Sequence, residues 1–285
     1  MQATIAELWI YPVKGCAGIS LKTAQALRTG LQYDRRWMVV AADTGKFITQ
    51  RTHPQMALIR TALGAAHLAL NFPNKPACLV PLNAMGAAKT VTVWNSTLSA
   101  IDAGNAAAQW LSEVLFGEVL SSNFLTSPVR LVQFDDAQTR AVREDSFEQH
   151  KHQFADGFPY LVLSQASVVA LNERLLENGS FTVDTNRFRA NIILADVDAH
   201  TEDFTKTLTH PNGAVFDMVK SCTRCGVPNI DQSTGKTHPS HEPNLTLAQY
   251  RYDKAADGVI FGMNAVISQA ATLAVGDVLN IQLDF

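Results

Sequence analysis

The sequence predicts a mainly β protein of the α+β class, with two β-barrel-like domains and a few helices. Short β-like runs dominate the chain, two segments have helical periodicity, and strands and helices do not alternate as βαβ units. Short strands separated by Gly and Pro are typical of barrels. The length of 285 residues allows two domains, which we place at residues 1–122 and 123–285.

The first hundred residues are predicted to form a compact β-rich unit. A Gly-containing loop at residues 43–46 (DTGK) is typical of a hairpin between two strands. Pro73, Pro76, Pro81 and Gly86 separate the later β-like runs. The strands expected in this unit are residues 8–11, 37–42, 47–50, 56–63, 68–72 and 90–94.

Two segments have the apolar spacing of helices. Residues 106–116 follow Asn105, which can cap a helix N-terminus. Residues 165–177 follow Ser164, another capping residue, and end before Asn178 and a glycine, which together form a helix stop signal. We therefore predict one helix over each segment.

The second half of the chain returns to strands after the second helix. A polar stretch ending in proline, residues 121–128 (SSNFLTSP), is the predicted linker between the two domains. Gly276 and Asp277 supply the last turn of the chain. The strands expected in this half are residues 190–194, 215–220, 259–261, 265–268 and 278–283.

The composition is that of a globular protein with a sizeable core, with 47% apolar and 17% charged residues. The formal net charge is −3, from 23 basic and 26 acidic residues, so we expect no nucleic-acid or membrane partner. The N-terminus has no secretory signal pattern, and no stretch approaches the roughly 18 apolar residues that span a bilayer. Four cysteines do not make a disulfide framework, so a reducing cytoplasm is the expected location.

The motifs of several common enzyme classes are absent from the sequence. It contains no GxGxxG after a strand, no GxxxxGK(S/T), no HExxH and no GxSxG. These absences weigh against nicotinamide, nucleoside triphosphate, zinc-protease and serine-hydrolase chemistry.

The stretch KSCTRCGVPNIDQSTG places Cys222 and Cys225 two residues apart and admits several interpretations. A zinc site with His238 and His241 has a suggestive spacing, but the Pro and Gly residues in between do not form the helix that would present both imidazoles. A thioredoxin-like redox pair needs a helix after the cysteines, which we do not predict. Small buried cysteines at a strand end would explain Cys222. Cys225, next to Arg224, has the positive neighbour that a thiolate needs.

Several short motifs in register resemble one family. CTRCGVPNIDQSTG, HEPNLTLAQYR and VGDVLNI resemble the MOSC domain (molybdenum cofactor sulfurase C-terminal domain). LWIYPVKGC and GLQYDRRWMVV resemble the β-barrel domain that precedes it in the mitochondrial amidoxime-reducing components and their bacterial relatives. FADGFPYLVLSQASVVALNERL and RFRANIIL fit the same family in the same order. The resemblance covers residues 8–285, which is essentially the whole chain.

The resemblance implies that the cofactor is molybdenum bound to molybdopterin, and it does not imply pyridoxal phosphate. Cys225 of the C-x-R-C motif is then the metal ligand and catalytic residue, while Cys222 is a structural neighbour. A thiolate is the soft ligand that such a metal tolerates best. The cofactor also carries a phosphate, which needs fixed cationic donors. The residues at matching cofactor-binding positions are Lys14, Arg35, Ser164, Ser167, Arg189, Asn191 and Arg224.

Two of these residues, Ser164 and Ser167, open the second predicted helix. Its N-terminal N–H groups could bind an anion or a pterin carbonyl. One position departs from the family pattern, because Gly15 stands where relatives place Ser after the lysine of YPVK. A side-chain hydrogen bond to the cofactor is therefore absent there.

The leading hypothesis is a cytoplasmic molybdenum-cofactor oxidoreductase that reduces small N-hydroxylated compounds. Four cysteines offer no ligand set for a 2Fe–2S cluster, so the electrons would come from a separate ferredoxin- or flavoprotein-type partner. One alternative is a sulfur carrier or sulfurtransferase that uses a persulfide on Cys225, and another is a cofactor-binding module without turnover. The basic residues Lys14 and Arg35 of the N-terminal domain favour the reductase.

Overall fold

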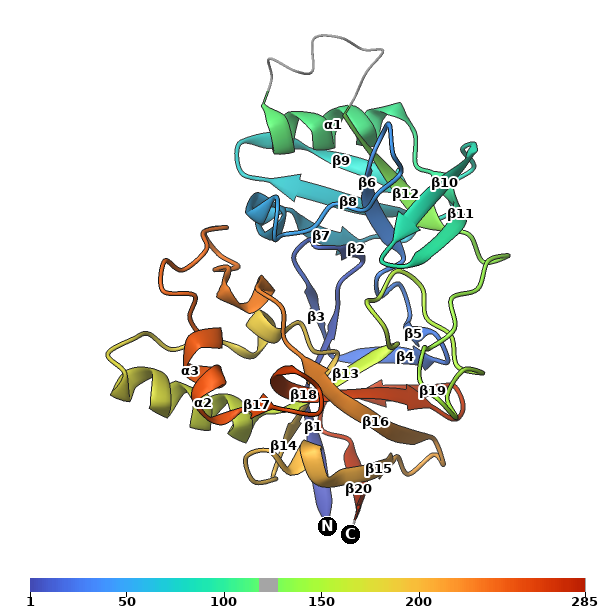
Figure 1. The fold of residues 1–285 in the computed structure, drawn as a ribbon. Coiled ribbons are helices and arrows are strands. Elements are labelled where there is room, and N and C mark those ends of the chain that lie inside the picture. Colours follow the sequence, from blue (N-terminus) through green and yellow to red (C-terminus); the bar gives the residue numbers. More distant parts are fainter. Residues whose placement is uncertain (118–127, 285) are drawn as a thin grey trace.

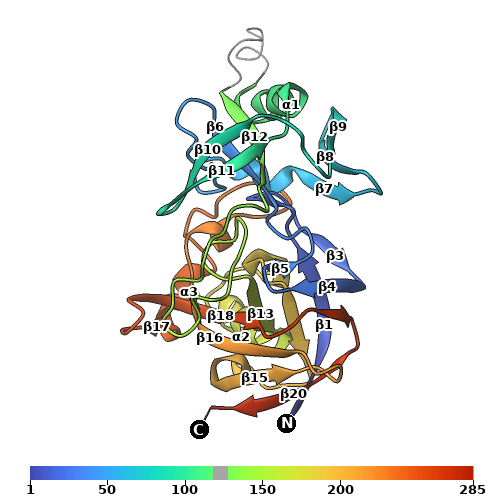
Figure 2. The same ribbon diagram turned by 90° about the vertical axis from the view of Figure 1, so that its right-hand side faces the viewer.

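The protein is described by a computed structural model, which covers residues 1–117 and 128–284. The chain forms two parts that are stacked end to end (Figures 1 and 2). A β-barrel carries both termini at one end of the molecule, and smaller sheets capped by helix α1 (Asn105–Phe116) form the other end. The mainly β fold predicted from the sequence is confirmed.

Seven strands of the described residues close into the barrel. They follow the order β13-β14-β1-β20-β15-β16-β18, and β18 pairs with β13 to close the ring. Neighbouring strands are antiparallel except β13 and β14, which are parallel. The strands are β1 (Gln2–Ile10), β13 (Tyr160–Ser164), β14 (Ile192–Ala195), β15 (Thr205–Thr209), β16 (Val215–Thr223), β18 (Gly258–Ile267) and β20 (Val278–Leu283).

Apolar side chains fill the interior of this barrel. Much of β1 alternates buried and more exposed residues, as expected for a strand with one side facing a core. Ile5, Leu8 and Phe216 are fully buried there, and Tyr160 packs edge-on against Phe216. The interior is therefore a packed core rather than a channel.

Shorter elements border the barrel. Helices α2 (Gln165–Glu177) and α3 (Asn244–Tyr250) lie on its outside (Figure 1), and their buried leucines pack with Phe188 and Phe261 in a second apolar cluster. No helix in the described part of the chain is long and apolar enough to cross a membrane. The other bordering elements are β3 (Ile19–Leu21), β4 (Thr23–Leu27), β5 (Gly30–Leu31), η3 (Thr185–Phe188), η4 (Thr201–Phe204), η5 (Val227–Asn229), β17 (Tyr252–Asp253) and β19 (Ala271–Ala274).

Two sheets form the other part of the molecule. One has the strand order β10-β11-β12-β6-β2, and the other has the order β7-β8-β9. Helix α1 packs against β9 and β12 and buries Trp110, Leu111 and Leu115. The elements are β2 (Val13–Lys14), β6 (Trp37–Ala41), η1 (Pro54–Leu58), β7 (Arg60–Leu63), β8 (His67–Phe72), β9 (Lys75–Pro81), β10 (Ala88–Val93), β11 (Ser96–Asp102) and β12 (Val129–Phe134).

The chain passes between the two parts more than once. β1 is a barrel strand that pairs with β14 and β20, whereas β2, which follows it closely, pairs with β6 in the five-stranded sheet. β12 also pairs with β6, before the chain returns to the barrel at β13. The predicted domain boundary between residues 122 and 123, and the predicted linker except Pro128, lie outside the described residues.

The second predicted helix is confirmed. Residues 165–177 form α2, and Ser164 Oγ accepts a hydrogen bond from the backbone N–H of Ser167 at 3.1 Å, as an N-cap does. Two runs predicted as separate strands, residues 259–261 and 265–268, belong to the single long strand β18. The local sequence pattern thus located both α2 and β18, although it divided β18 into two strands.

Two predicted strands differ in the structure. Residues 56–63 are not one strand, because Pro54 begins the 3-10 turn η1 and strand pairing starts only at Arg60. Residues 47–50 do not form a strand, and Phe47 makes an isolated bridge to a residue of β6 instead. In both places the apolar run continues through residues whose backbone turns away from a sheet.

The predicted cap of the first helix is wrong. Gly104 precedes α1, Asn105 is the first residue of the helix, and among the described residues no side chain caps its N-terminus. The Oδ1 atom of Asn105 instead accepts a hydrogen bond from Arg130 Nη1 at 2.8 Å. The side chain of Asn105 therefore contacts β12 and does not cap the helix.

Candidate functional site

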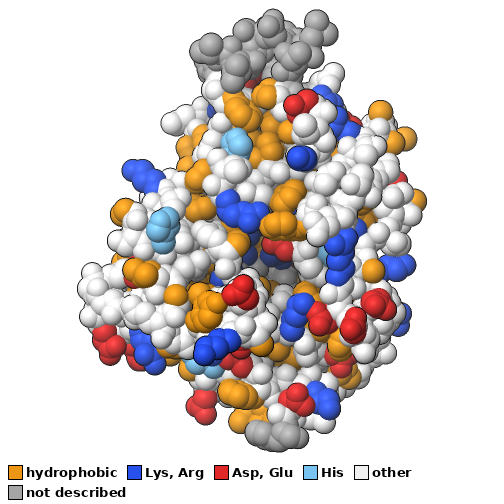
Figure 3. Space-filling view, viewed as in Figure 1, with side chains coloured by type: hydrophobic (Ala, Val, Ile, Leu, Met, Phe, Trp, Pro, Cys, Tyr) orange, Lys and Arg blue, Asp and Glu red, His pale blue; other side chains and the backbone are white. Residues whose placement is uncertain are grey.

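A cleft lies between the barrel and the smaller sheets, and residues from both parts line it. Figure 3 shows a hollow on this face of the molecule, with Lys and Arg side chains around it. An excess of positive charge in a cleft favours an anionic ligand. The charged residues of the described cleft wall are five cations, Lys14, Arg35, Arg51, Arg189 and Arg224, and one carboxylate, Asp156.

Arg35 and Arg189 meet at the ring of Tyr11. Their guanidinium carbons lie 4.3 and 4.2 Å from its centroid, within the range of cation–π contacts. The hydroxyl of buried Tyr11 donates to the carbonyl of Ala190 at 3.2 Å. Arg35 also donates from Nη1 to Asp34 Oδ2 at 2.6 Å. These contacts place two guanidinium groups from distant parts of the sequence side by side at the cleft.

In this cluster Arg189 and Tyr11 have shifted pKa values, and both arginines have an unusual backbone conformation. Burial lowers the pKa of Arg189 to about 10, and repulsion from Arg35 acts in the same direction. Burial raises the pKa of Tyr11 to about 12, although Arg189 and Arg35 oppose this, so the phenol stays neutral. Arg35 and Arg189 have φ angles of 48° and 58°, a left-handed conformation that non-glycine residues rarely adopt and that often occurs at functional sites. An anion between these groups would relieve the repulsion.

Lys14 of β2 forms an ion pair with Asp156, which lies in the loop before β13. Lys14 Nζ also donates to the carbonyl of Phe154 at 2.8 Å, and Trp94 Nε1 donates to Asp156 Oδ1 at 2.8 Å. Burial lowers the pKa of Lys14, while Asp156 opposes the shift. The cleft environment would raise the pKa of Asp156, but Lys14 and Trp94 hold it well below its usual range. Arg51 lies over the ring of Trp94, 4.8 Å from the centroid.

Cys222 and Cys225 lie at the end of β16, and both line the cleft. Cys225 is exposed, whereas Cys222 is half-buried. Arg224 donates from Nη1 to the sulfur of Cys222 at 3.2 Å and from Nη2 to the carbonyl of Phe188 at 2.8 Å. Its Nε is buried and has no partner in the described part of the chain. Arg224 therefore binds the sulfur of Cys222, and the exposed thiol of Cys225 is accessible to a ligand.

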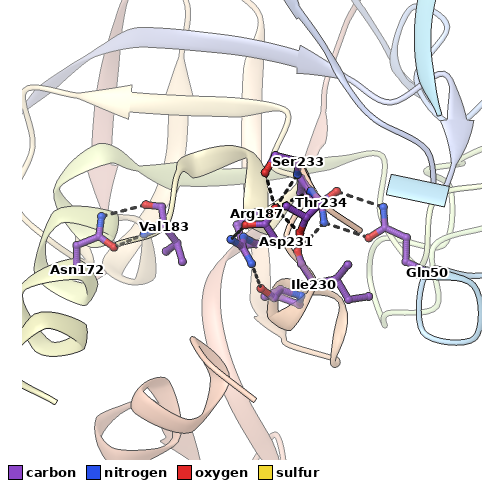
Figure 4. Close-up of polar contacts among 10 residues, drawn as sticks. Gln50, Asn172, Val183, Arg187, Ile230, Asp231, Ser233 and Thr234 are labelled. Carbon is purple, nitrogen blue, oxygen red and sulfur yellow. Dashed lines mark hydrogen bonds and ion pairs between the residues drawn. The ribbon is translucent and has the colours of Figure 1, made fainter. Parts of the chain in front are cut away.

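Polar contacts hold the loop at residues 226–235, which follows the second cysteine (Figure 4). Asp231 Oδ1 accepts hydrogen bonds from the backbone N–H groups of Ser233 and Thr234 at 2.9 and 2.8 Å. Asp231 Oδ2 accepts one from Arg187 Nη2 at 3.1 Å. Burial would raise the pKa of Asp231, but the hydrogen bonds from Ser233 and Thr234 outweigh it and lower the pKa to about 2. The carboxylate thus organises the loop as an anion.

Asn191 lines the cleft, but the fold already uses its side-chain amide. Oδ1 accepts from the backbone N–H of Leu161 at 3.2 Å, and Nδ2 donates to the carbonyl of Trp9 at 3.1 Å. The backbone of Asn191 pairs with the same two residues. Asn191 therefore connects β1 to β13 and shapes the cleft wall.

The structure does not bring Ser164 and Ser167 to the cleft, which corrects the position predicted for them. Both are fully buried, and their hydroxyl oxygens lie 2.7 Å apart. Ser167 Oγ donates to the buried carboxylate of Glu202 at 2.7 Å. Tyr160 and Leu161, at the start of β13, line the cleft, whereas Ser164 ends that strand, roughly 10 Å further along at about 3.3 Å per residue. A helix does begin at Gln165 as predicted, but its N-terminus faces the buried polar group formed by Ser164, Ser167 and Glu202.

Within residues 1–117 and 128–284, no group of three or more His, Cys, Asp and Glu side chains is placed to bind a metal ion. His238, a member of the zinc alternative, packs on Phe181 with ring centroids 4.8 Å apart.

The sequence interpretation named neither Trp94 nor Gln50, which line the cleft, nor Tyr11, which is buried beneath two of its arginines. Tyr11 belongs to the recognised motif LWIYPVKGC, but nothing in that motif predicts that its ring contacts two arginines. Trp94 follows the last residue of β10 at the hairpin turn and has a positive φ of 52°, which no local signal predicts. The side-chain partner of Gln50 is Gln232, which lies 182 residues away in the sequence.

Two family models match the chain. A model described as the MOSC N-terminal beta barrel domain matches residues 2–118, and one described as the MOSC domain matches residues 149–280. Mitochondrial amidoxime reducing component 2 of Bos taurus is 30% identical over 290 residues, which cover 96% of this chain and 82% of that protein. Mitochondrial amidoxime-reducing component 1 of Homo sapiens is 29% identical, with 96% and 81% covered. Molybdenum cofactor sulfurase of Drosophila erecta is 32% identical over 258 residues, covering 87% of this chain and 30% of that protein.

Proposed function

Since the chain belongs to the family of MOSC-domain proteins that includes the mitochondrial amidoxime-reducing components, we propose that it is a cytoplasmic, molybdenum-cofactor-dependent reductase of small N-hydroxylated compounds. The observation that carries the proposal is a cation-lined cleft with one exposed thiol, Cys225, in its wall. In this proposal Cys225 is the metal ligand. Lys14, Arg35, Arg189 and Arg224 form the cationic surround of the cofactor.

The residues of the cleft fit such a cofactor. Among the described residues, the side chain of Arg189 donates one hydrogen bond, from Nη1 to the carbonyl of Cys16 at 2.8 Å. Its other N–H groups, and the buried, unpartnered Nε of Arg224, are donors that a phosphate or pterin oxygen can use. A thiolate is a suitable ligand for a metal already held by sulfur atoms. Asn191 supports the wall and need not donate to the cofactor.

The proposed reduction of a hydroxylamine is balanced by two electrons and two protons. Reduction of R–NH–OH to R–NH2 breaks the N–O bond, consumes two electrons and two protons, and releases water. The bound molybdenum centre would supply the two-electron transfer. The electrons would come from a separate ferredoxin- or flavoprotein-type protein. Cys225 would hold the centre in place, and the cation–π pair of Arg51 and Trp94 would border the substrate.

A pair of cysteine variants tests this function. The full chain is produced in a host that makes the cofactor, and molybdenum is measured by elemental analysis and pterin by the fluorescence of its oxidised form. Stoichiometric molybdenum and reduction of a hydroxylamine with a chemical electron donor are expected for the unsubstituted chain. Cys225→Ala should lose both, whereas Cys222→Ala should keep the metal. A well-folded chain without molybdenum or pterin would contradict the proposal.

A persulfide carrier is the second candidate function. The exposed thiol of Cys225 and the similarity to a molybdenum cofactor sulfurase favour it, although the chain spans 30% of that relative. A carrier would show sulfane sulfur on Cys225 and little molybdenum. The same preparation of the unsubstituted chain, assayed for both, separates the two functions.

A further inference from the structure

Gln50 connects the smaller sheets to the loop at residues 226–235, which directly follows the proposed metal ligand Cys225. Its side chain is 1% exposed, and its Nε2 donates to the carbonyl of Gly15 at 2.8 Å and to Gln232 Oε1 at 3.2 Å. Gln232 Nε2 donates back to Gln50 Oε1 at 3.2 Å. The two amides therefore form a reciprocal pair between the two parts of the molecule.

The loop is also anchored on its barrel side (Figure 4). Asp231, next to Gln232, is bound by Arg187, and Arg187 Nη1 also approaches the carbonyl of Pro228 at 3.4 Å. The segment that leads into Arg187 is fixed to α2, because the side chain of Asn172 makes two hydrogen bonds with the backbone of Val183, at 3.0 and 2.8 Å. The loop thus has one anchor in each part of the molecule.

Local contacts order the stretch from Cys225 to Gln232. It contains the 3-10 turn η5, and Ile230 forms a bridge with Thr237. Asn244 Nδ2 donates to the carbonyl of Cys225 at 2.8 Å. Only six residues separate Cys225 from Gln232, so we expect a displacement of Gln232 to shift Cys225 as well.

We propose that Gln50 and Gln232 are positioning residues, whose amide pair holds the thiol of Cys225 against the cationic wall of the cleft. Neither amide contacts the thiol, so the pair acts through the loop. The smaller sheets thereby set the position of a ligand that the barrel supplies. The role as a metal ligand rests on the proposed function, but the placement of the thiol can be measured without any cofactor.

The test compares two alkylating reagents on cofactor-free full-length chain. A Cys222→Ser background leaves Cys225 as the accessible thiol, because Cys16 and Cys78 are 0% and 8% exposed. Iodoacetate carries a negative charge and iodoacetamide is neutral, so the ratio of their rates reports the positive potential at the thiol, and the thiolate fraction cancels. Gln50→Leu and Gln232→Leu should each lower this ratio by about two- to fivefold at low salt.

A double-mutant cycle isolates the amide pair. If the two residues act as one unit, the chain with both substitutions should show the same ratio as either single variant. Gln25→Leu is the matched control, because Gln25 of β4 is exposed and bonds Thr272 of the neighbouring strand β19, and neither residue lines the cleft. Its ratio should equal that of the parent chain, and thermal midpoints confirm that each variant is folded.

Two outcomes overturn the inference, namely an unchanged ratio in both single variants, and fold-changes that multiply in the double variant. The proposed function has a separate readout. In the cofactor-loaded chain, either single substitution should speed the loss of molybdenum on dilution. A parent chain that never binds molybdenum contradicts the function, while its alkylation ratios still decide the positioning of Cys225.

Discussion

Arg35 donates a hydrogen bond from Nη2 to the backbone carbonyl of Arg189 over 2.8 Å, although both side chains are positively charged. The ring of Tyr11 contacts both guanidinium groups. Each such contact is worth about 0.5–2 kcal/mol, depending on desolvation. This arrangement holds two positive charges together at one place in the cleft, which favours an anionic ligand there.

Arg189→Lys should lower the pterin content of the purified protein. Lysine cannot present the planar fork of an arginine to a phosphate or stack in the same way on Tyr11. The loss of one charged hydrogen bond corresponds to about 2 kcal/mol of binding free energy. The fluorescence of the oxidised pterin measures this loss. Arg60→Lys, at an exposed position of β7, should retain the full content, and equal contents in the two variants would contradict the assignment.

Asp156→Ala should destabilise the protein, because it leaves the ammonium group of Lys14 without its carboxylate in a place where Lys14 is 8% exposed. Removing one partner of a buried pair costs about 3–5 kcal/mol. The side chain of Asp156 is itself 70% exposed, so we expect about 1–2 kcal/mol after solvent screening. Adding Lys14→Met should recover part of this loss in urea unfolding. Losses that simply add would show that the pair is not coupled.

The strands and helices that follow local patterns could be predicted from the sequence. The bounds of α2 and of β20 follow from periodicity and turn residues, because those signals lie within a few residues of each element. The membership of β1 in the barrel could not be predicted in this way. Thr4 of β1 pairs with Ala195 of β14 and Val278 of β20, which lie 191 and 274 positions later, and periodicity carries no information about such pairing.

The candidate site shows the same division between local and long-range information. Lys14, Arg35, Arg189 and Cys225 were found because short motifs contain them, and the structure brings them to one cleft. The capping signal of Ser164 predicts where α2 begins, but it does not tell whether that end of the helix faces a cleft or the core. The distance of Ser164 from the cleft follows from the course of β13, which a local pattern cannot supply.

Glu202→Gln should stabilise the protein at neutral pH. Glu202 is 1% exposed, and its Oε2 has no partner in the described chain. Burial raises the pKa of this carboxyl, although the hydrogen bonds from Ser167 and from the backbone of Ser164 oppose the shift. Ionisation therefore favours the unfolded chain, so the unfolding free energy falls as the pH rises above the pKa of an unfolded glutamate.

Thermal midpoints at acidic and neutral pH check this prediction. The glutamine variant cannot ionise, so its midpoint should exceed that of the parent at pH 7 and match or fall below it at pH 4. Glu173→Gln, at an exposed position of α2, is the control and should leave the difference between the two pH values unchanged. An equal shift at both pH values would mean that ionisation of Glu202 is not involved.

His152 should make the protein acid-sensitive well above the pH at which carboxylates titrate. Its ring is 3% exposed and lies 3.3 Å from Arg140 Nη1. Burial lowers the pKa of His152 to about 3, and the positive charges of Arg140 and Lys14 act in the same direction. The neutral ring is thus favoured in the folded chain. Its stabilising effect is complete above the unfolded pKa of about 6.5 and is lost as the pH falls toward 3.

The pH dependence of unfolding in urea measures this effect. Between pH 6.5 and 4.5 the group should remove about 2–3 kcal/mol of unfolding free energy, at about 1.4 kcal/mol per pH unit. His152→Gln should flatten the profile in this window, because glutamine does not titrate. His67→Gln, at an exposed position of β8, should keep the slope of the parent. A slope that survives in the His152 variant would assign the acid sensitivity to other groups.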